Sequence, residues 1–170
     1  IQYKDAMFTT PVHAVLFCYN VWTDNFNDIE GVTFLKGMPS RDDIEKLTDS
    51  RLHSLLTLDD LAEKLQKNNF ATELFTAYSH HFNMSIGVTL HNLFTPHTRT
   101  ISLNLGYFFL YKNPRDTEQI KMLGGQLGMR EVLTLAYNDM DTQYQYIVVD
   151  MTGRCSEKLR IRLTFFLART

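Results

Sequence analysis

Two adjacent carboxylates, Asp59 and Asp60, come directly after the short apolar run Leu52–Leu58. A buried strand that ends in paired acids places them at the carboxyl edge of a sheet, where open α/β folds bind ligands. At such an edge one acid can hold Mg²⁺, usually through water, while its neighbour polarises a water that attacks a nucleotide γ-phosphate. The pair therefore has the chemistry of a Walker B element.

A second interpretation of the acid pair needs only local structure. Either acid could be the N-cap of a helix over Leu61–Lys67, because carboxylates bind the first helical amides and interact favourably with the helix dipole. The pattern GxxxxGK[ST], which cradles nucleotide phosphates, occurs nowhere from Ile1 to Thr170. The sequence thus carries a hydrolysis element without its phosphate-binding partner.

Histidines and cysteines do not have the spacing of a metal site. His80 and His81 are adjacent and would point apart on a helix, and no CxxC or HxxxH pairing occurs. We expect these two histidines to lie near the last carbonyls of a helix. Cys18 and Cys155 form no disulfide framework, which suits a reducing compartment.

Two groups of residues could contact nucleic acid, and each has a plainer interpretation. The aromatic side chains of Tyr19, Trp22 and Phe26 could stack on bases, or they could cover a sheet edge. The only local basic cluster could contact DNA or another subunit, or it could be a solvated face. That cluster consists of Arg154, Lys158, Arg160 and Arg162.

Composition indicates one globular domain. The chain has 170 residues, which is long enough to bury a core. Its content of 44% hydrophobic and 21% charged residues is too apolar for an intrinsically disordered chain. No apolar run approaches the roughly 20 residues that cross a bilayer, and the first residues show no signal-peptide pattern. We expect an intracellular protein in the cytoplasm or nucleus, with no membrane contact. The net charge of −2 creates no general field that would attract nucleic acid.

Apolar runs alternate with helical patterns along the chain, which predicts an α/β fold. Such an order is typical of a mainly parallel sheet flanked by helices on both faces. The predicted helices cover Leu61–Lys67 and Phe70–His80. The predicted strands cover Val12–Tyr19, Val32–Leu35, Leu52–Leu58, Met84–Leu90, Tyr107–Tyr111, Tyr144–Asp150 and Arg160–Leu167.

A third helix is predicted from its end signals. Asn113 is suited to the N-cap, Pro114 to the first helical position and Gly128 to the C-terminal end. Between them one apolar face is formed by Ile120, Leu123 and Leu127.

Six blocks of this sequence resemble, in the same order, the packaging ATPases of the FtsK–HerA superfamily. The likeness is strongest to viral and Maverick/Polinton-type members related to the poxvirus DNA-packaging ATPase. The blocks are KDAMF, VLFCYNVW, LLTLDDL, ELFTAYSHHFNMSIGVTLHNLF, RTISLN and LYKNPRD, within residues 4–166. The resemblance implies a P-loop NTPase-like core of the RecA/ASCE type. Because KDAMF follows the P-loop helix in that family, we expect residues 1–170 to be a single, N-terminally incomplete domain without the Walker A strand, loop and helix.

The resemblance also assigns roles to particular residues. It assigns Asp59 to Mg²⁺, through water, and Asp60 to activation of the attacking water. The family's sensor position falls at His91 and Asn92, where relatives often read TQN. The spacing alone agrees equally well with two residues that cap a loop.

Two arginines match basic positions of the family. Either Arg99 or Arg115 could reach phosphate across a subunit boundary as an arginine finger, because a planar guanidinium neutralises transition-state charge. The plainer interpretation is a surface ion pair, which for Arg115 is explained locally by the neighbouring Asp116.

In an intact relative, the resemblance implies that Mg²⁺ and ATP bind between subunits of a homo-oligomeric ring and that hydrolysis moves double-stranded DNA into a viral capsid. The chain alone is expected to hold neither cofactor firmly. One alternative is a non-enzymatic interaction or assembly module derived from such an ATPase. The other is a metal-dependent nuclease built from Asp59, Asp60 and Asp150, which requires the strand of Asp150 to lie beside Leu52–Leu58.

Overall fold

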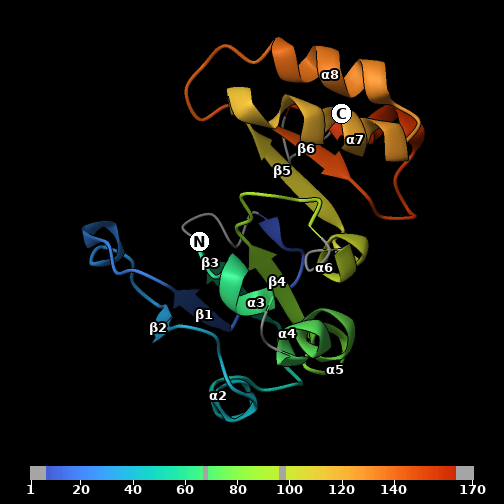
Figure 1. Ribbon diagram of the computed structural model, residues 1–170. Helices are drawn as coiled ribbons and strands as arrows, with labels where there is room; N and C mark the ends of the chain where they lie inside the picture. The colour runs from blue at the N-terminus through green and yellow to red at the C-terminus, as the bar shows by residue number, and fades with distance from the viewer. Residues whose placement is uncertain (1–6, 67–68, 96–98, 164–170) are drawn as a thin grey trace. The chain divides into compact units, whose positions relative to one another are not determined.

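The computed structural model describes residues 7–66, 69–95 and 99–163 of the chain. It divides the chain into two compact units, Ile1–Asn104 and Leu105–Thr170. Each unit contains its own sheet (Figure 1). The sequence predicted one domain with one sheet, and the prediction of one sheet is wrong.

The sheet of the first unit is parallel throughout, as the sequence predicted. Its four strands lie in the order β2-β1-β3-β4. Their bounds are Ala14–Tyr19 for β1, Thr33–Lys36 for β2, Ser54–Asp59 for β3 and Met84–Val88 for β4.

The two central strands, β1 and β3, form the core of this sheet. Leu16 is paired with Leu56 and Cys18 with Leu58, and all four side chains are buried. Burial, assisted by the charge of Asp43, raises the pKa of the Cys18 thiol to about 12. Cys18 is therefore an inert apolar side chain at neutral pH, because the thiolate is the reactive form of cysteine.

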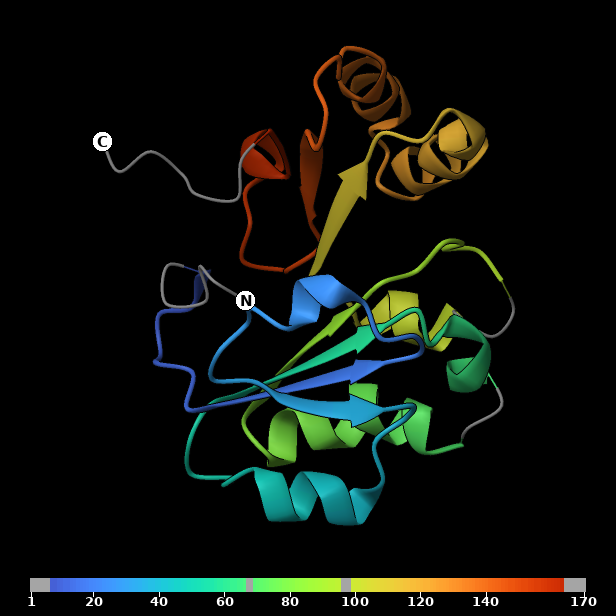
Figure 2. The ribbon, with the colours of Figure 1, turned by 90° about the vertical axis from the view of Figure 1, so that its left-hand side faces the viewer.

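The helices of the first unit pack against this sheet. Figure 2 shows α2 and the helix formed by α4 and α5 on the same side of the sheet. A π-helical turn, Leu74–Tyr78, joins α4 to α5, so the predicted helix Phe70–His80 is confirmed with an irregular centre. The bounds are Arg41–Leu47 for α2, Ala62–Gln66 for α3, Asn69–Glu73 for α4, Ser79–His81 for α5 and Arg99–Asn104 for α6.

Helix α2 was not predicted, although its start signal is in the sequence. Ser40 accepts a hydrogen bond from the Asp43 backbone N–H, and the Asp43 carboxylate accepts one from the Ser40 backbone N–H. This reciprocal arrangement is a capping box with aspartate in place of the usual glutamate. Ile44 then buries its side chain completely.

The aromatic cluster around Trp22 covers the edge strand β2. Phe26 stacks on Phe34 of β2 at 5.5 Å between ring centroids, and Trp22 lies 5.2 Å from Phe34. Tyr19 also contacts Phe26 and Phe34. The structure favours the interpretation as a sheet cover over a base-stacking platform.

The second unit has an antiparallel sheet, in the order β5-β6-β7, with two helices on one face (Figure 2). The reason is visible in β5, where Phe108 and Leu110 are buried while Tyr107, Phe109 and Tyr111 are exposed. Alternation of this kind is typical of an antiparallel strand packed on one side, and the uniform run of apolar letters hides it. The bounds are Tyr107–Tyr111 for β5, Thr117–Gln126 for α7, Arg130–Asn138 for α8, Tyr146–Asp150 for β6 and Ile161–Arg162 for β7.

The predicted start and end of the third helix are confirmed. Asn113 caps the 3₁₀ turn Pro114–Asp116 that leads into α7, with its side-chain oxygen accepting the N–H of Arg115 at 3.1 Å. At the other end Gly128 has a φ of +68°, and the Met129 N–H bonds the Gly124 carbonyl at 2.8 Å. This is a Schellman motif, in which glycine takes the left-handed position.

Helix α8 was missed, and Tyr137 attaches it to the rest of the unit. The buried Tyr137 hydroxyl accepts the N–H of Asn113 at 2.7 Å and donates to the Asn113 carbonyl at 2.9 Å. Lys112 donates to the carbonyls of Tyr137 and Asn138, which are orphan acceptors at the end of α8.

The predicted basic cluster is partly an internal ion-pair network. The side chains of Arg160 and Arg162 are only 14% and 11% exposed. Arg160 pairs with Glu157 at 2.7 Å, and Arg162 pairs with the buried Asp150 at 3.2 Å. The interpretation as a solvated face is therefore wrong for these two arginines. The predicted strand Arg160–Leu167 is seen as β7, and its residues 164–167 lie outside the described residues.

None of the described helices is both long and apolar enough to cross a membrane.

We predict that alanine at Gly124 and at Gly125 will have opposite effects on stability. A Cβ on Gly124 would lie 2.8 Å from the Cα of Arg130, whereas a Cβ on Gly125 would meet the movable end of the Arg130 side chain at 2.9 Å. Gly124→Ala should lower the free energy of unfolding by about 1–3 kcal/mol through overpacking. Gly125→Ala should raise it by up to about 1 kcal/mol, because alanine is the better helix former. Urea denaturation of both variants measures the difference, and equal effects would contradict the close approach.

We also predict that Asp150 makes the unfolding free energy sensitive to acid. Burial alone would raise the pKa of this carboxyl, but hydrogen bonds from Thr152 and the charge of Arg162 lower it below the ordinary 3.8. The stabilisation is therefore present above pH 3.8 and is lost as the pH falls through the lower native pKa. Asp150→Asn should flatten the loss of stability below pH 3.8, measured by urea denaturation against pH. Asp141→Asn, an exposed residue between α8 and β6 of the same unit, is the control. An unchanged dependence of stability on pH in Asp150→Asn would refute the assignment.

Candidate functional site

Polar side chains gather where the strands of the parallel sheet end. Asn20 follows β1, Asp59 ends β3 and is followed by Asp60, and Thr89 follows β4. Because the strands are parallel and Tyr19 is in register with Asp59, these residues share the carboxyl edge of the sheet. The expected position of the acid pair is confirmed.

Asp59 is half-buried and held by the neighbouring strand end. Its Oδ1 accepts a hydrogen bond from the Thr89 hydroxyl at 3.0 Å. The Thr89 backbone N–H in turn donates to the Leu58 carbonyl at 3.0 Å, which extends the ladder between β3 and β4. Within the described residues the other carboxylate oxygen of Asp59 has no hydrogen-bond donor, so it is available to a ligand.

Asp60 adopts a left-handed backbone conformation, with a φ of +51°. Its Oδ2 faces the Nδ2 of Asn20 at 3.5 Å, and its Oδ1 faces the Nε2 of His91 at 3.6 Å. The side chain is 56% exposed, so solvent reaches the carboxylate between these two neighbours. Left-handed residues other than glycine are enriched at functional sites, and aspartate tolerates the conformation better than most.

Lys64 completes the cluster from helix α3. Its Nζ donates to the Oδ1 of Asn20 at 2.9 Å. We did not identify Asn20, Lys64 or Thr89 from the sequence. Asn20 could have been found because it directly follows a predicted strand, as Asp59 does. Lys64 lies within the helix predicted over Leu61–Lys67, which directly follows the acid pair.

The acid pair does not act as a simple helix cap. In the described part of the chain the two carboxylates contact the side chains of Thr89, Asn20 and His91, which come from other segments. This pattern favours a site over the local interpretation as an N-cap.

The other predicted site residues are only partly brought together. The side-chain oxygen of Asn92 accepts a hydrogen bond from the Phe94 N–H at 3.1 Å. This contact agrees with the interpretation in which Asn92 caps a loop. Arg99 begins α6 and is exposed, and among the described residues its side chain has no ion pair with Asp59 or Asp60. Arg115 lies in the 3₁₀ turn Pro114–Asp116 of the second unit, where its backbone N–H donates to the side chain of Asn113.

The donor set of the cluster fits Mg²⁺ in its usual water-rich form. Mg²⁺ keeps several waters and binds through one or two carboxylates rather than a cage of protein ligands. Asp59 supplies one such carboxylate, and Asp60 is next to it. Among the described residues no group of three or more histidine, cysteine or acidic side chains could hold a metal ion.

Asp150 does not meet the condition that the nuclease alternative requires. Its strand, β6, has β5 and β7 as neighbours, whereas β3 lies between β1 and β4 in the other sheet. The Asp150 carboxylate also accepts hydrogen bonds from Thr152 and pairs with Arg162. The residue has a structural role in the second unit.

We predict that glycine will stabilise position 60 and destabilise position 59. Asp60 has a φ of +51°, which glycine adopts without steric cost, whereas Asp59 is an extended residue of β3. Asp60→Gly should raise the unfolding free energy by up to about 1 kcal/mol, and Asp59→Gly should lower it by at least about 0.5 kcal/mol. Thermal or urea denaturation compares the two variants. A loss of stability in Asp60→Gly as large as in Asp59→Gly would contradict backbone strain at Asp60.

Comparison of the chain with family models, with curated proteins and with solved structures finds no match. The resemblance to packaging ATPases therefore stays a prediction from the sequence blocks.

Proposed function

We propose that this chain supplies the metal- and water-binding half of an ATP-hydrolysing site. The observation that carries the proposal is the acid pair at the carboxyl end of the parallel strand β3, surrounded by polar side chains from the adjacent strand ends. Ligands of open parallel sheets bind at this edge. The strand order also places Asn20 and Thr89, from two different neighbours of β3, on either side of the acids.

The two acids have different surroundings, which supports different roles. Asp59 is half-buried, is oriented by the Thr89 hydroxyl and keeps one oxygen available, as a ligand to water-coordinated Mg²⁺ requires. Asp60 is solvent-accessible and lies between Asn20 and His91, so it can accept a proton or a hydrogen bond from an attacking water. Mg²⁺ would neutralise charge that develops on the transferred phosphoryl group.

The wider function that we propose is a viral-type DNA-packaging or DNA-translocating ATPase of the FtsK–HerA superfamily. The six sequence blocks support it, and the parallel sheet with terminal acids is compatible with it. In this proposal ATP binds between subunits of a ring, Arg99 or Arg115 reaches the neighbouring subunit's phosphates, and double-stranded DNA is moved into a capsid.

A non-enzymatic interaction or assembly module is the second candidate. It is favoured by one observation, that the sequence contains no GxxxxGK[ST] loop. Backbone amides and the lysine of that loop supply most contacts to a bound triphosphate. The acid pair would then be a remnant without turnover.

We predict that the 170-residue chain binds MgATP weakly and does not hydrolyse it, and that a phosphate loop makes the acids essential. The loop is supplied by fusing a strand–GxxxxGK[ST]–helix segment before Ile1. In the fusion, Asp60→Asn should lower turnover by about 10²–10⁴-fold while MgATP affinity is retained. Calorimetry measures binding, and phosphate release measures turnover. Asp49→Asn is the matched control, because Asp49 is a half-buried acid of the same unit that pairs with Arg51.

Three outcomes of this experiment discriminate the proposals. Turnover by the fusion that is insensitive to Asp60→Asn would refute the assigned role of the acid pair. Nucleotide binding without any turnover would favour the interaction module. Micromolar MgATP affinity of the chain alone, lost in Asp59→Ala, would contradict the need for an added phosphate loop.

A further inference from the structure

Both polar groups of the Asn20 side-chain amide, the oxygen and the NH₂ group, make contacts. The Nζ of Lys64 lies 2.9 Å from one end, and an ammonium group can only donate hydrogen bonds. The end of the amide that faces Lys64 is therefore the oxygen, and the NH₂ group must point the other way. It points at Oδ2 of Asp60, 3.5 Å away. Lys64 thus determines which way Asn20 is turned.

Three segments are required to make this arrangement. Asn20 follows β1, Asp60 follows the adjacent β3, and Lys64 lies on α3. The turn after β2 lies beside the lysine, since a Cβ built on Gly37 would be in ordinary van der Waals contact with its Nζ, at 3.9 Å. Gly37 has a φ of +92° and donates its N–H to the Tyr19 carbonyl at 2.8 Å, which holds that turn beside β1. The strand ends therefore give Lys64 a defined place.

Asn20 also separates a cation from an acid. In the described residues Lys64 forms no ion pair with Asp60, although both contact Asn20. A direct ion pair would occupy a carboxylate oxygen that a general base must present to water. The long contacts at 3.5 Å to Asn20 and 3.6 Å to His91 orient the carboxylate and leave its lone pairs accessible. Catalytic hydrogen bonds are often this long before substrate binds.

We infer that Asn20 and Lys64 are positioning residues for Asp60, with Lys64 orienting the Asn20 amide and Asn20 orienting the carboxylate. This inference rests on the proposed function, in which Asp60 activates water. It goes beyond that proposal by assigning a role to two residues that were not identified from the sequence.

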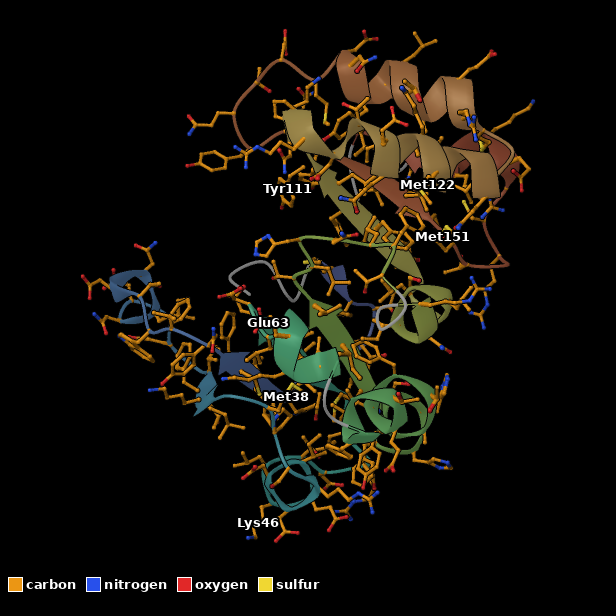
Figure 3. The ribbon with its side chains drawn as sticks, viewed as in Figure 1. Met38, Lys46, Glu63, Tyr111, Met122 and Met151 are labelled. Atoms are coloured by element: carbon orange, nitrogen blue, oxygen red, sulfur yellow. The ribbon has the colours of Figure 1, made fainter. Side chains whose placement is uncertain are left out.

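The contact itself is tested in the 170-residue chain without nucleotide. The Nδ2 amide resonances of Asn20, assigned in ¹⁵N NMR spectra by their loss in Asn20→Ala, report the environment of its NH₂ group. Lys64→Met and Asp60→Asn should each shift this resonance pair. Lys46→Met is the matched control, because Lys46 lies on α2 (Figure 3) and pairs with Asp42 at 3.8 Å. Chemical shifts of the Asn20 side-chain amide that are unchanged in both Lys64→Met and Asp60→Asn would overturn the inference.

The positioning role is tested by turnover of the fusion that carries the phosphate loop. Asn20→Ala should lower kcat about tenfold or more with an unchanged MgATP affinity, as is typical for loss of a partner that orients a functional group. The double variant Asn20→Ala/Lys64→Met should be no slower than Asn20→Ala, because Lys64 acts only through Asn20. Asn20→Asp should not restore turnover, since its carboxylate attracts Lys64 and offers no donor to Asp60.

The two proposals fail in different ways. Turnover that depends on Asp60 but is unchanged by Asn20→Ala would overturn the positioning role and leave the proposed function intact. If the Asn20 resonances shift in Lys64→Met and Asp60→Asn but no turnover depends on Asp60, the proposed function is overturned. The contact between Asn20 and Asp60 would then exist without a catalytic role.

Discussion

The parallel pairing of β1 with β3 is the constraint on which the candidate site depends. The two strands pair over six positions, from Ala14 with Ser54 to Tyr19 with Asp59, and most of the side chains are buried. Because parallel strands end at the same edge, this pairing brings Asn20 beside Asp60 from 40 residues away in the chain. An antiparallel pairing would have placed them at opposite ends of the sheet.

A carboxylate at a strand end has a different role in each unit, and its partners decide which. Asp150, at the end of β6, is buried, accepts hydrogen bonds from Thr152 and pairs with Arg162. Its negative charge is therefore neutralised within the fold. Asp59 and Asp60 instead contact the hydroxyl of Thr89, the amide of Asn20 and the imidazole of His91. The hydroxyl and the amide orient a carboxylate without supplying a neutralising charge, so the carboxylates keep the ability to bind a cation or a water.

Much of the fold could be predicted from the sequence, because local patterns carry it. The runs Val12–Tyr19 and Leu52–Leu58 are strands in the structure, and Asn113 and Gly128 bound the third helix through cap geometry. Helix α8 was missed although Leu133 and Tyr137, four residues apart and both buried, give it a local helical pattern. Its attachment through the Tyr137 hydroxyl and the Asn113 backbone joins positions that are distant in sequence. Strand pairing is equally non-local, and so the antiparallel sheet of the second unit was not predicted.

By itself the sequence determined that a strand ends in two adjacent acids. The apolar run before Asp59 and Asp60 predicts a strand that ends at the acids, whatever that strand pairs with, and β3 ends at Asp59. Only the tertiary structure decided which side chains surround them. The order β2-β1-β3-β4 brings Asn20 and Thr89 to the acids, while packing of α3 brings Lys64 to Asn20. The physical reason is that strand identity follows from local hydrophobicity, whereas the neighbours of a strand follow from burial of the whole sheet.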